Sequence, residues 1–541
     1  MSSVDLSIFI VYMIAMLGVG AYFLVKNKNR DDYYVGGRSM GSLHIGLSVV
    51  ATDVGGGFSI GLGGLGFLVG ISGSWMLFTG LLGAWISAVL LIPKIKELGD
   101  RKKFFTFPQI FSFFYNKETA LIAGIISAIG YIGFSSSQIL AGAKLASSTF
   151  PDISLTTALL IMGAIAVIYT SIGGLKAVIY TDTIQWILLI GGLVFIGIPI
   201  SYYAVGGWET IQTTLEPEFF QMNNLRWQQV VYWAVTIIPI WFTGMTLYQR
   251  IYASRNVKQA KRAWFFAGLL EWPIMALMGT ALGLLGRVAF ESGMFAELGY
   301  AAGQAFDEEM GLPLLLNTVL PSGLLGIMLA AFFSAILSTA DSCLMAASGN
   351  IQTDILERIF KFGDNKKLHL LVSQIITLSI GILAVTLAGF MQNVLDLMLY
   401  SYAFMVSGLF MPVIAALFVK NIKPLSAILA MLGGGGTTLL LQMFKIQIPV
   451  RIAQAELSQK ITEIQAAFPS LSDVNFTKMT VKEISLYISD LQLIYFKFME
   501  ISFKLPYGLD ANIFGILVSI VLFFGSHYIL NRKTSKTNSR Q

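Results

Sequence analysis

Long runs of apolar residues, separated by short polar segments, divide the chain along almost its whole length. Each run has about 20 or more residues, enough for an α-helix to cross a hydrocarbon core of about 30 Å. The runs lack the alternation of barrel strands, and only helices or closed barrels satisfy their backbone in lipid. The pattern predicts an all-α polytopic membrane protein with thirteen transmembrane helices, at residues 6–25, 43–69, 74–93, 119–148, 154–171, 179–203, 228–247, 263–286, 317–349, 368–390, 393–419, 424–444 and 510–530.

The positive charges predict how these helices are oriented. Lys26, Lys28 and Arg30 follow the first apolar run, so we interpret it as a retained span with its N-terminus outside, and not as a signal peptide. An odd number of spans then places the C-terminus inside. The segments assigned to the inner side hold 26 of the 36 Lys and Arg residues, as the positive-inside rule requires, and the outer segment 289–316 holds none. This topology accounts for the net charge of +6, so no nucleic-acid partner is expected.

The segment 445–509 is the exception, because it is assigned to the outside and yet carries seven basic residues. A segment longer than about 60 residues crosses the membrane largely regardless of its charge. It has an amphipathic stretch, a break at Pro469 and a capping box formed by Thr480 and Glu483. We expect two helices on the outer face, which either decorate the fold or act as a lid or partner-binding element.

The stretch ATDVGGGFSIG, residues 51–61, places Asp53 and three consecutive glycines inside a predicted span. Charge is costly in the bilayer and glycine weakens a helix, so tight helix packing is the alternative explanation for the glycines alone. Secondary transporters place their sites at such interruptions near the midplane, where free carbonyls bind cations. An inverted repeat requires a second break five spans later, and the span 228–247 carries Pro239 and Gly244 there.

The span 317–349 has an oxygen-rich face. A hydroxyl in a span often only binds the carbonyl four residues earlier. Here, however, two hydroxyl pairs surround Asp341 and offer the hard oxygen ligands that suit Na⁺. Asp182 is a further acid inside a span and is therefore a functional candidate. The residues that share the face at i, i+3, i+4 and i+7 are Ala335, Ser338, Thr339 and Ser342.

Four motifs stand out along the chain: YVGGRSMG (34–41), GGLKAVIYTDTIQ (173–185), YQRIYASRNVKQAKRA (248–263) and SAILSTADSCLMAAS (334–348). Together they resemble the sodium/solute symporter family, whose members transport proline, pantothenate, sialic acid, glucose and choline. The resemblance covers about residues 5–445, and VGGR, ATDVGGGF and STADS are most similar to the choline-transporter branch. It implies a LeuT-like core, a five-plus-five inverted repeat with one helix before it and more after it.

The resemblance also implies ligands for the coupling ion. A second sodium site occurs in some members, and Asp341 stands where a serine is frequent, which makes this site unusually acidic. We expect two Na⁺ per cycle; the alternative is one Na⁺ with a protonated carboxyl at the second site. The first site corresponds to the carbonyls of Ala51, Val54 and Ala335 with the hydroxyls of Ser338 and Thr339, and the second to Asp182, Ser338, Asp341 and Ser342.

The sequence determines the solute less clearly than the coupling ion. Choline transporters surround the ammonium with aromatic rings, but where they have a tryptophan this chain has Asp53, which resembles the proline-transporter branch. Asp53 could pair with an ammonium group or only organise the first sodium site. An amino acid or a choline-like cation or zwitterion is favoured; a sugar or an organic anion is the alternative. The candidate solute-binding residues are Asp53, Gly55, Gly56, Phe134, Gln138, Trp241, Phe242, Tyr248, Tyr400 and Phe404.

Other functions fit the sequence less well. Three scattered histidines and the absence of a phosphate-binding loop argue against an enzyme or an ATP-driven pump. A transporter-like sensor or channel is the remaining alternative, although only eleven residues follow the last span. We expect a multi-pass protein of the plasma membrane, the cytoplasmic membrane in a bacterium, with an undetermined oligomeric state. The predicted units are residues 1–42 (first helix and inner loop), 43–203 and 204–422 (the two repeats), 423–444 (an added helix), 445–509 (the outer insertion) and 510–541 (last helix and tail).

Overall fold

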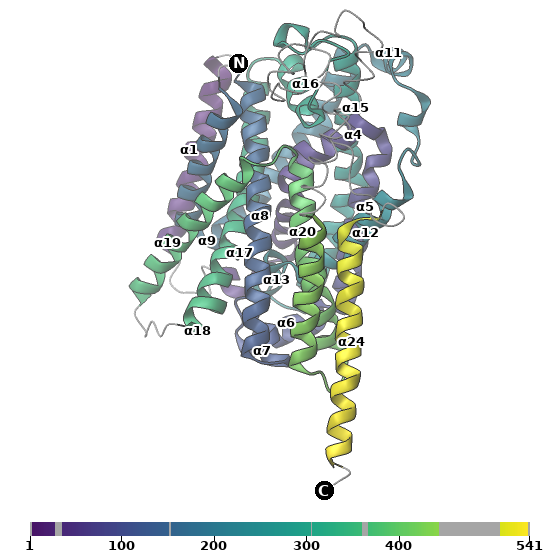
Figure 1. Ribbon diagram of the computed structural model, residues 1–541. Helices are drawn as coiled ribbons and strands as arrows, with labels where there is room; N and C mark the ends of the chain where they lie inside the picture. The colour runs from purple at the N-terminus through teal and green to yellow at the C-terminus, as the bar shows by residue number, and fades with distance from the viewer. Residues whose placement is uncertain are drawn as a thin grey trace, which may run out of the picture.

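The protein is a bundle of long helices, shown by a computed structural model in Figure 1. Within the described part of the chain, nine helices are long and apolar enough to cross a membrane, or ten if one bent pair counts as a single span. No β-strand occurs in these ranges. The predicted helices of residues 445–509 lie outside the described residues. The structure describes residues 3–26, 35–150, 153–304, 306–359, 366–442 and 509–538.

The first half of the bundle contains helices from the N-terminus to residue 204. Its elements are α1 (Ser3–Lys26), α3 (Ser42–Gly56), a π-helical turn (Gly57–Leu62), α4 (Gly63–Val69), α5 (Trp75–Leu90), α6 (Ile92–Lys102), α7 (Gln109–Phe114), α8 (Lys117–Thr149), α9 (Leu155–Gly192) and α10 (Ile198–Ala204).

The second half repeats the alternation of long and broken helices. Its elements are α11 (Gly207–Thr214), α12 (Trp227–Thr243), α13 (Met245–Ala253), α14 (Val257–Leu269), a π-helical turn (Leu270–Met275), α15 (Ala276–Glu291), α16 (Gly311–Val319), α17 (Leu324–Gly349), α18 (Glu357–Ile359), α19 (Lys366–Ala388), α20 (Val394–Phe418), the helix Pro424–Gln442 and α24 (Ala511–Asn538).

The structure differs from the predicted spans at three places. The predicted inner loop at 172–178 is helical and belongs to α9. The span predicted at 317–349 begins only at Leu324, because α16 forms a separate short helix before it. The span predicted at 228–247 extends to Ala253 as the bent pair α12–α13. In each case the apolar pattern locates a helix, whereas its ends depend on packing and on local breaks.

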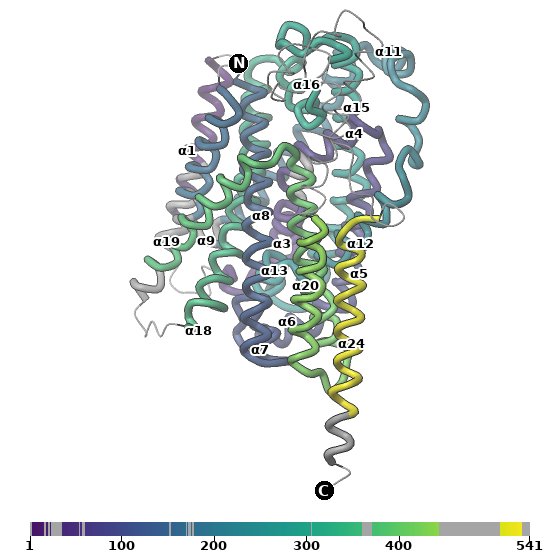
Figure 2. Tube along the Cα trace, in the orientation of Figure 1, coloured from purple at the N-terminus to yellow at the C-terminus, as the bar shows by residue number. Residues whose placement is uncertain are grey.

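The centre of the bundle is formed by α3 and α17. Helix α17 packs against α3, α8 and α9, and α20 packs against α8, α12 and α24. Figure 2 shows α3 in the middle of the bundle, with α8 and α20 near it. Because every residue of α17 from Met328 to Gly349 is buried, polar groups on this helix face protein and not lipid. A functional site on α3 and α17 is therefore enclosed on all sides.

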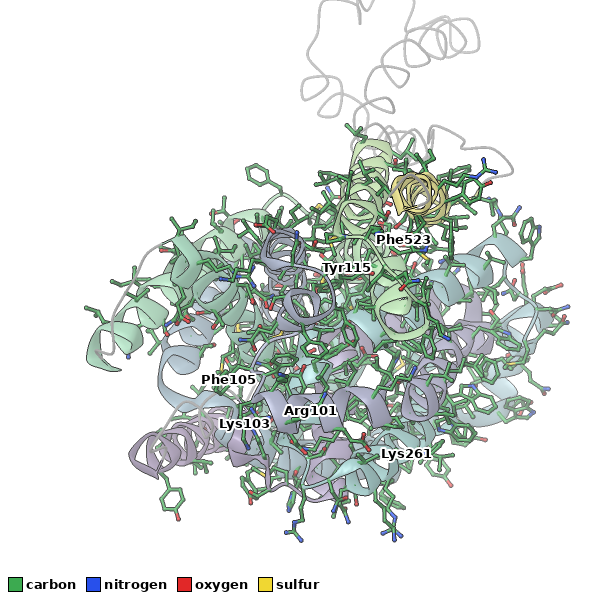
Figure 3. All side chains as sticks on the ribbon, turned by 90° about the horizontal axis from the view of Figure 1, so that it is seen from below. Arg101, Lys103, Phe105, Tyr115, Lys261 and Phe523 are labelled. Atoms are coloured by element: carbon green, nitrogen blue, oxygen red, sulfur yellow. The ribbon has the colours of Figure 1, made fainter. Side chains whose placement is uncertain are left out.

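One end of the bundle carries several basic side chains. Helix α1 begins at one end and α24 ends at the other (Figure 1). Seen from below, Arg101, Lys103 and Lys261 lie at the end toward which α24 runs (Figure 3). This arrangement supports the prediction that this end faces the cytoplasm, because inner loops carry an excess of Lys and Arg.

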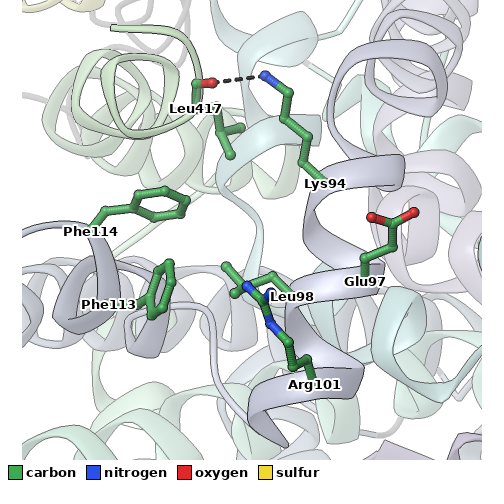
Figure 4. A pocket seen from close by; sticks show the side chains of 7 residues that line it. All are labelled: Lys94, Glu97, Leu98, Arg101, Phe113, Phe114 and Leu417. Carbon is green, nitrogen blue, oxygen red and sulfur yellow. Dashed lines mark hydrogen bonds between the residues drawn. The ribbon is translucent and has the colours of Figure 1, made fainter. Parts of the chain in front are cut away.

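A pocket also lies at this basic end, between α6, α7 and α20 (Figure 4). In it the Lys94 ammonium donates a hydrogen bond to the carbonyl of Leu417 at 2.8 Å. None of the predicted solute or sodium ligands lines the pocket, so we do not assign it to the transport site. Its lining residues are Lys94, Glu97, Leu98, Arg101, Phe113, Phe114 and Leu417.

The opposite end is held by a buried ion pair. Lys144 of α8 lies 2.6 Å from Glu309 and 2.6 Å from Asp307, both in the segment before α16. Glu309 also accepts the backbone N–H groups of Val394 and Leu395, the first residues of α20. This network fastens the segment 289–316, which is predicted to be extracellular, to α8 and α20.

Candidate functional site

Helix α3 is interrupted at Gly55, inside the stretch that the sequence singled out. Gly55 has φ 41° and ψ −130°, a conformation that L side chains rarely adopt. A Cβ atom there would lie 2.6 Å from both Gln138 Oε1 and Thr339 Oγ1, and one at Gly56 would lie 2.6 Å from Ala141. Glycine is therefore required here both by the backbone and by the close approach of α8 and α17.

The second break separates α12 from α13. Gly244 leaves the helical conformation with φ −70° and ψ 113°, and the two helices meet at 44°. Pro239 lies inside α12, one turn before the break. The first N–H groups of α13 have no partner within their own helix, and that of Thr246 donates to the hydroxyl oxygen of Tyr131 at 3.1 Å. Both breaks thus fall in the spans where the inverted repeat predicts them.

One face of α8 borders both breaks. Tyr131, Phe134 and Gln138 recur at i, i+3 and i+7, which places them on one side of the helix. Tyr131 receives the N–H of Thr246 at the second break, whereas Gln138 Oε1 accepts the N–H of Gly56 at the first, at 2.6 Å. All three side chains are buried. Tyr131 was not among the predicted residues.

Asp53 lies beside the first break and is nearly enclosed, with 8% of its surface exposed. The hydroxyl of Tyr402, on α20, donates to Asp53 Oδ1 at 3.3 Å. The ring of Tyr402 also meets that of Phe134 edge to face, with centroids 4.9 Å apart. The structure therefore brings Asp53, Phe134 and Gln138 together around the break, as the predicted solute site requires, and adds Tyr402.

The two other predicted residues of α20 lie elsewhere. Tyr400 lies on the side of α20 that faces Asp396 and Asp510, and Phe404 packs against Gly435 of the helix Pro424–Gln442. On α20 it is Tyr402, and not the predicted Tyr400 or Phe404, whose hydroxyl bonds to Asp53. The helix is apolar on all sides, so its sequence carries no signal for the face that turns inward.

The aromatic residues predicted near the second break are packed by protein. The indole of Trp241 lies so close to α5 that a Cβ at Gly83 would clash with it. The ring of Phe242 lies 5.8 Å from that of Phe410, and the Tyr248 hydroxyl donates to the carbonyl of Phe242 at 2.8 Å. The indole N–H of Trp241 is buried without a hydrogen-bond partner, so of these residues it retains a free donor.

The first predicted sodium site brings oxygen atoms of α3 and α17 together. The Thr339 hydroxyl lies 2.7 Å from the carbonyl oxygen of Ala51 and 3.2 Å from that of Ala335. Val54 lies on the next turn of α3, directly before the break. Carbonyl and hydroxyl oxygens are hard, neutral ligands, the donor set that suits Na⁺. Ser338, also predicted here, instead donates to Asp182 Oδ1.

The second predicted sodium site is a cluster of buried polar side chains on α9 and α17. Asp182 accepts hydrogen bonds from Ser338 and, at 2.5 Å, from Ser48. Asp341 accepts from Thr170 at 2.5 Å through Oδ1, while its Oδ2 has no partner. All four predicted residues, Asp182, Ser338, Asp341 and Ser342, are buried.

Arg250 joins this cluster, which the sequence analysis missed. Its guanidinium lies 3.6 Å from Asp182 Oδ2 and donates to Ser342 at 2.9 Å and to Ser48 at 3.1 Å. The predicted span ended at residue 247, so Arg250 was assigned to the inner loop, whereas α13 continues to Ala253 and buries it completely. The cluster contains two carboxyls and one guanidinium. When both acids are ionised it therefore carries one net negative charge, which one further cation would neutralise.

Comparison with known proteins places this arrangement in context. The profile of a family described as "Sodium:solute symporter family" matches residues 33–434. The "High-affinity proline transporter PutP" of Bacillus subtilis is 26% identical over 440 residues, which cover 79% of this chain and 89% of that protein. The "Sodium/proline symporter" of Escherichia coli is 28% identical over 406 residues, which cover 73% of this chain and 79% of the relative.

More distant similarity extends to animals and to solved structures. The "Sodium/glucose cotransporter 1" of Ovis aries is 24% identical over 461 residues, 78% of this chain and 68% of that protein. The solved structure of a Na⁺-coupled sialic acid symporter, in a substrate-bound outward-open state, superposes with a TM-score of 0.68. That match has 21% sequence identity and covers 97% of this chain and 96% of the other. It shows a common fold.

Proposed function

This chain belongs to the sodium:solute symporter family and is a sodium-coupled symporter of small organic solutes, and we propose that its solute carries an amine or ammonium group that binds beside Asp53. It is a multi-pass membrane transporter and not an enzyme. The named relatives include proline and glucose transporters, so the family alone does not select the solute. The resemblance to the choline branch stays a prediction.

One observation carries the proposal: a buried carboxyl and a set of carbonyl and hydroxyl oxygens lie at the same interrupted helix. Asp53 offers negative charge beside the break at Gly55, while the Ala51 carbonyl on the preceding turn meets the Thr339 hydroxyl. Occupation of the oxygen set by Na⁺ would hold α3 against α17. The solute would then bind one turn away, where Gln138, Phe134 and Tyr402 surround Asp53.

This adjacency explains how the two bound species would be coupled. Na⁺ that fixes α3 also fixes Asp53, so it improves the solute site without touching the solute. Linkage requires the converse effect: the solute must raise the affinity for Na⁺ by the same factor. Alternating access would then expose the loaded site first to the outside and afterwards to the cytoplasm, with both species released inside.

The second cluster would bind a further cation. Asp341 Oδ2 is the buried oxygen without a partner, and the hydroxyl of Ser338 lies one turn away on the same helix. We propose that a second Na⁺ binds at Asp341, beside the ion pair of Asp182 and Arg250; a protonated Asp341 is the alternative. In either case one positive charge would complete the cluster.

The experiment that tests the proposal is a thermal-stability screen of the purified protein in detergent. The solutes are proline, choline, betaine, simple amines, glucose, sialic acid and pantothenate, each tested in Na⁺ and in K⁺. A ligand at about 100 times its Kd stabilises a protein by about 2.7 kcal/mol, which a melting curve detects. We expect stabilisation by an amine or ammonium compound in Na⁺ only. A Na⁺-dependent response to a sugar or an organic anion alone would refute the solute class but not the symport.

A further inference from the structure

Glu271 is a second acid at the centre of the bundle that the predicted transport site does not use. It lies in the π-helical turn Leu270–Met275, where Trp272 departs from helical geometry with φ −135° and ψ 128°. The side chain is 0% exposed, and both of its carboxylate oxygens lack a hydrogen-bond partner. An unpaired buried carboxylate is unfavourable by several kcal/mol, so an acid at such a position within a span indicates a function.

The carboxyl of Glu271 lies near that of Asp53. The turn Leu270–Met275 packs against α3, and the two acids are close enough to influence each other, although they belong to spans more than 200 residues apart in sequence. Helix α5 leaves space for this approach, because a Cβ at Gly80 would clash with Glu271 Oε2. Two ionised carboxylates only accept hydrogen bonds and repel one another, so they do not satisfy each other.

The protein supplies no counter-charge to this pair within the described part of the chain. Its three most deeply buried cations are used elsewhere. Arg250 pairs with Asp182, Lys144 with Asp307 and Glu309, and Lys96 with Asp100. No ion pair in the described ranges includes Asp53 or Glu271. When both acids are ionised, the compensating positive charge therefore has to come from what the site binds; a proton shared between the two carboxyls is the alternative.

A Na⁺ ion at the first sodium site cannot balance both acids, because it carries one charge. We propose that Asp53 and Glu271 form a paired-carboxylate site for the solute, and that the solute is an organic cation with at least two N–H donors, such as a primary ammonium or a guanidinium. One N–H would be directed to each carboxylate. This inference rests on the proposed function and narrows its solute class from any amine or ammonium compound to a cation that donates hydrogen bonds.

The same geometry disfavours the other solutes. With one Na⁺ at the first sodium site, a sugar leaves one of the two buried negative charges without compensation, and an organic anion adds another. A quaternary ammonium supplies charge but no N–H, so the oxygens of Glu271 would remain buried acceptors without a hydrogen bond, which is unfavourable. A zwitterion places its own carboxylate close to the pair. A protonated primary amine without a carboxylate avoids all three costs.

The test uses Glu271→Gln, which removes the charge and keeps the shape. Ethanolamine and choline are the matched probes, because they share one skeleton and differ only in the methyl groups on nitrogen; agmatine, proline and glucose complete the set. Melting curves are recorded in Na⁺ and in K⁺, with and without each probe. The control is Asp354→Asn, a buried carboxyl toward the basic end of the bundle that accepts a hydrogen bond from Thr106.

We expect ethanolamine or agmatine to stabilise the wild type in Na⁺ more than choline or glucose does. Glu271→Gln should weaken that binding about ten- to a hundredfold, the effect of losing one charged hydrogen bond, and should keep the shift produced by Na⁺ alone. Asp354→Asn should keep both. If Glu271→Gln proves unstable, Gly80→Ala provides the same test, since its Cβ displaces the Glu271 carboxyl without removing the charge.

The outcomes separate this inference from the proposed function. Na⁺-dependent binding of proline or glucose that survives Glu271→Gln would overturn the paired-carboxylate site and leave symport intact. Loss of the Na⁺ shift in Glu271→Gln would also overturn it, because Glu271 would then belong to the sodium site. If no probe shows any dependence on Na⁺, the proposed function itself is refuted.

Discussion

The first sodium site is tested most directly by replacing Thr339 with valine. Valine has nearly the volume of threonine, so the packing against Gly55 is retained and only the hydroxyl is lost. That hydroxyl lies 2.7 Å from the Ala51 carbonyl and 3.2 Å from the Ala335 carbonyl. The change therefore removes the proposed ligand without opening a cavity.

The expected loss follows from the strength of one contact to a charge. A hydrogen bond or ligand to a charged group is worth about 1.5–3 kcal/mol, which corresponds to a factor of about 10 to 150 in affinity. Thr339→Val should raise the Na⁺ concentration for half-maximal uptake by that factor and leave the maximal rate at saturating Na⁺ nearly unchanged. Reciprocity requires the solute affinity at limiting Na⁺ to fall as well.

The assay is uptake of radiolabelled solute into liposomes over a series of Na⁺ concentrations. Thr339→Ser should behave like the wild type, because it retains the hydroxyl. Thr377→Val is the matched control: Thr377 is another buried threonine, but its hydroxyl bonds to the Ser373 carbonyl of α19 and to the hydroxyl of Ser348 at the far end of α17, not to the carbonyls of the first sodium site. An unchanged Na⁺ dependence in Thr339→Val, with uptake intact, would refute the assignment of Thr339 as a sodium ligand.

Three further predictions concern the surrounding residues. Asp341→Asn should lower the Hill coefficient for Na⁺ from about two to about one if a second Na⁺ binds there; an unchanged coefficient in uptake assays would favour a protonated carboxyl. Arg250→Met leaves Asp182 buried without a cation and should destabilise the fold by about 3–5 kcal/mol in denaturation experiments. The double variant of Arg250→Met and Asp182→Asn should recover much of this loss in melting curves. If the losses of stability from the two changes simply added, the ion pair would be contradicted. Tyr402→Phe should weaken solute binding severalfold in the thermal-shift assay, whereas Tyr400→Phe should not. Equal effects of the two changes would contradict the placement of Tyr402, and not Tyr400, at the solute site.

The breaks in the helices could be predicted because their cause is local. Three consecutive glycines beside Asp53 and the pair Pro239 and Gly244 weaken helices wherever they occur, so the sequence alone locates both interruptions. The family profile then accounts for the overall fold. The ends of the helices could be predicted less well from the sequence, because packing and not composition decides where a span stops. The extension of α13 to Ala253 is an example.

The sequence analysis missed residues that tertiary packing brings to the centre of the bundle, for different reasons. Tyr402 could not be chosen over Tyr400, since α20 is apolar all round and its orientation depends on its neighbours. Arg250 was missed with the end of its span. Glu271 did leave a signal: it is an acid within the predicted span 263–286, the same criterion that selected Asp182.

The buried charges suggest why transport would be coupled. Four acids lie around the break in α3 and along α17, namely Asp53, Glu271, Asp182 and Asp341, whereas Arg250 is the one cation that pairs with any of them in the described ranges. With all four ionised, three negative charges are uncompensated. Two Na⁺ ions and one monovalent organic cation would neutralise them together, whereas any partial load leaves at least one buried charge, at a cost of several kcal/mol.

This balance predicts a leak when one acid is removed. In Glu271→Gln two uncompensated charges remain, which two Na⁺ ions neutralise without solute, so the carrier should be able to close and turn over with Na⁺ alone. Influx of ²²Na⁺ into liposomes without solute should therefore be faster in Glu271→Gln than in the wild type, while Asp354→Asn should show no increase. Equal leak rates in all three proteins would mean that charge neutralisation does not govern closure. Coupling would then have to depend on the shape of the solute and its contacts at the break.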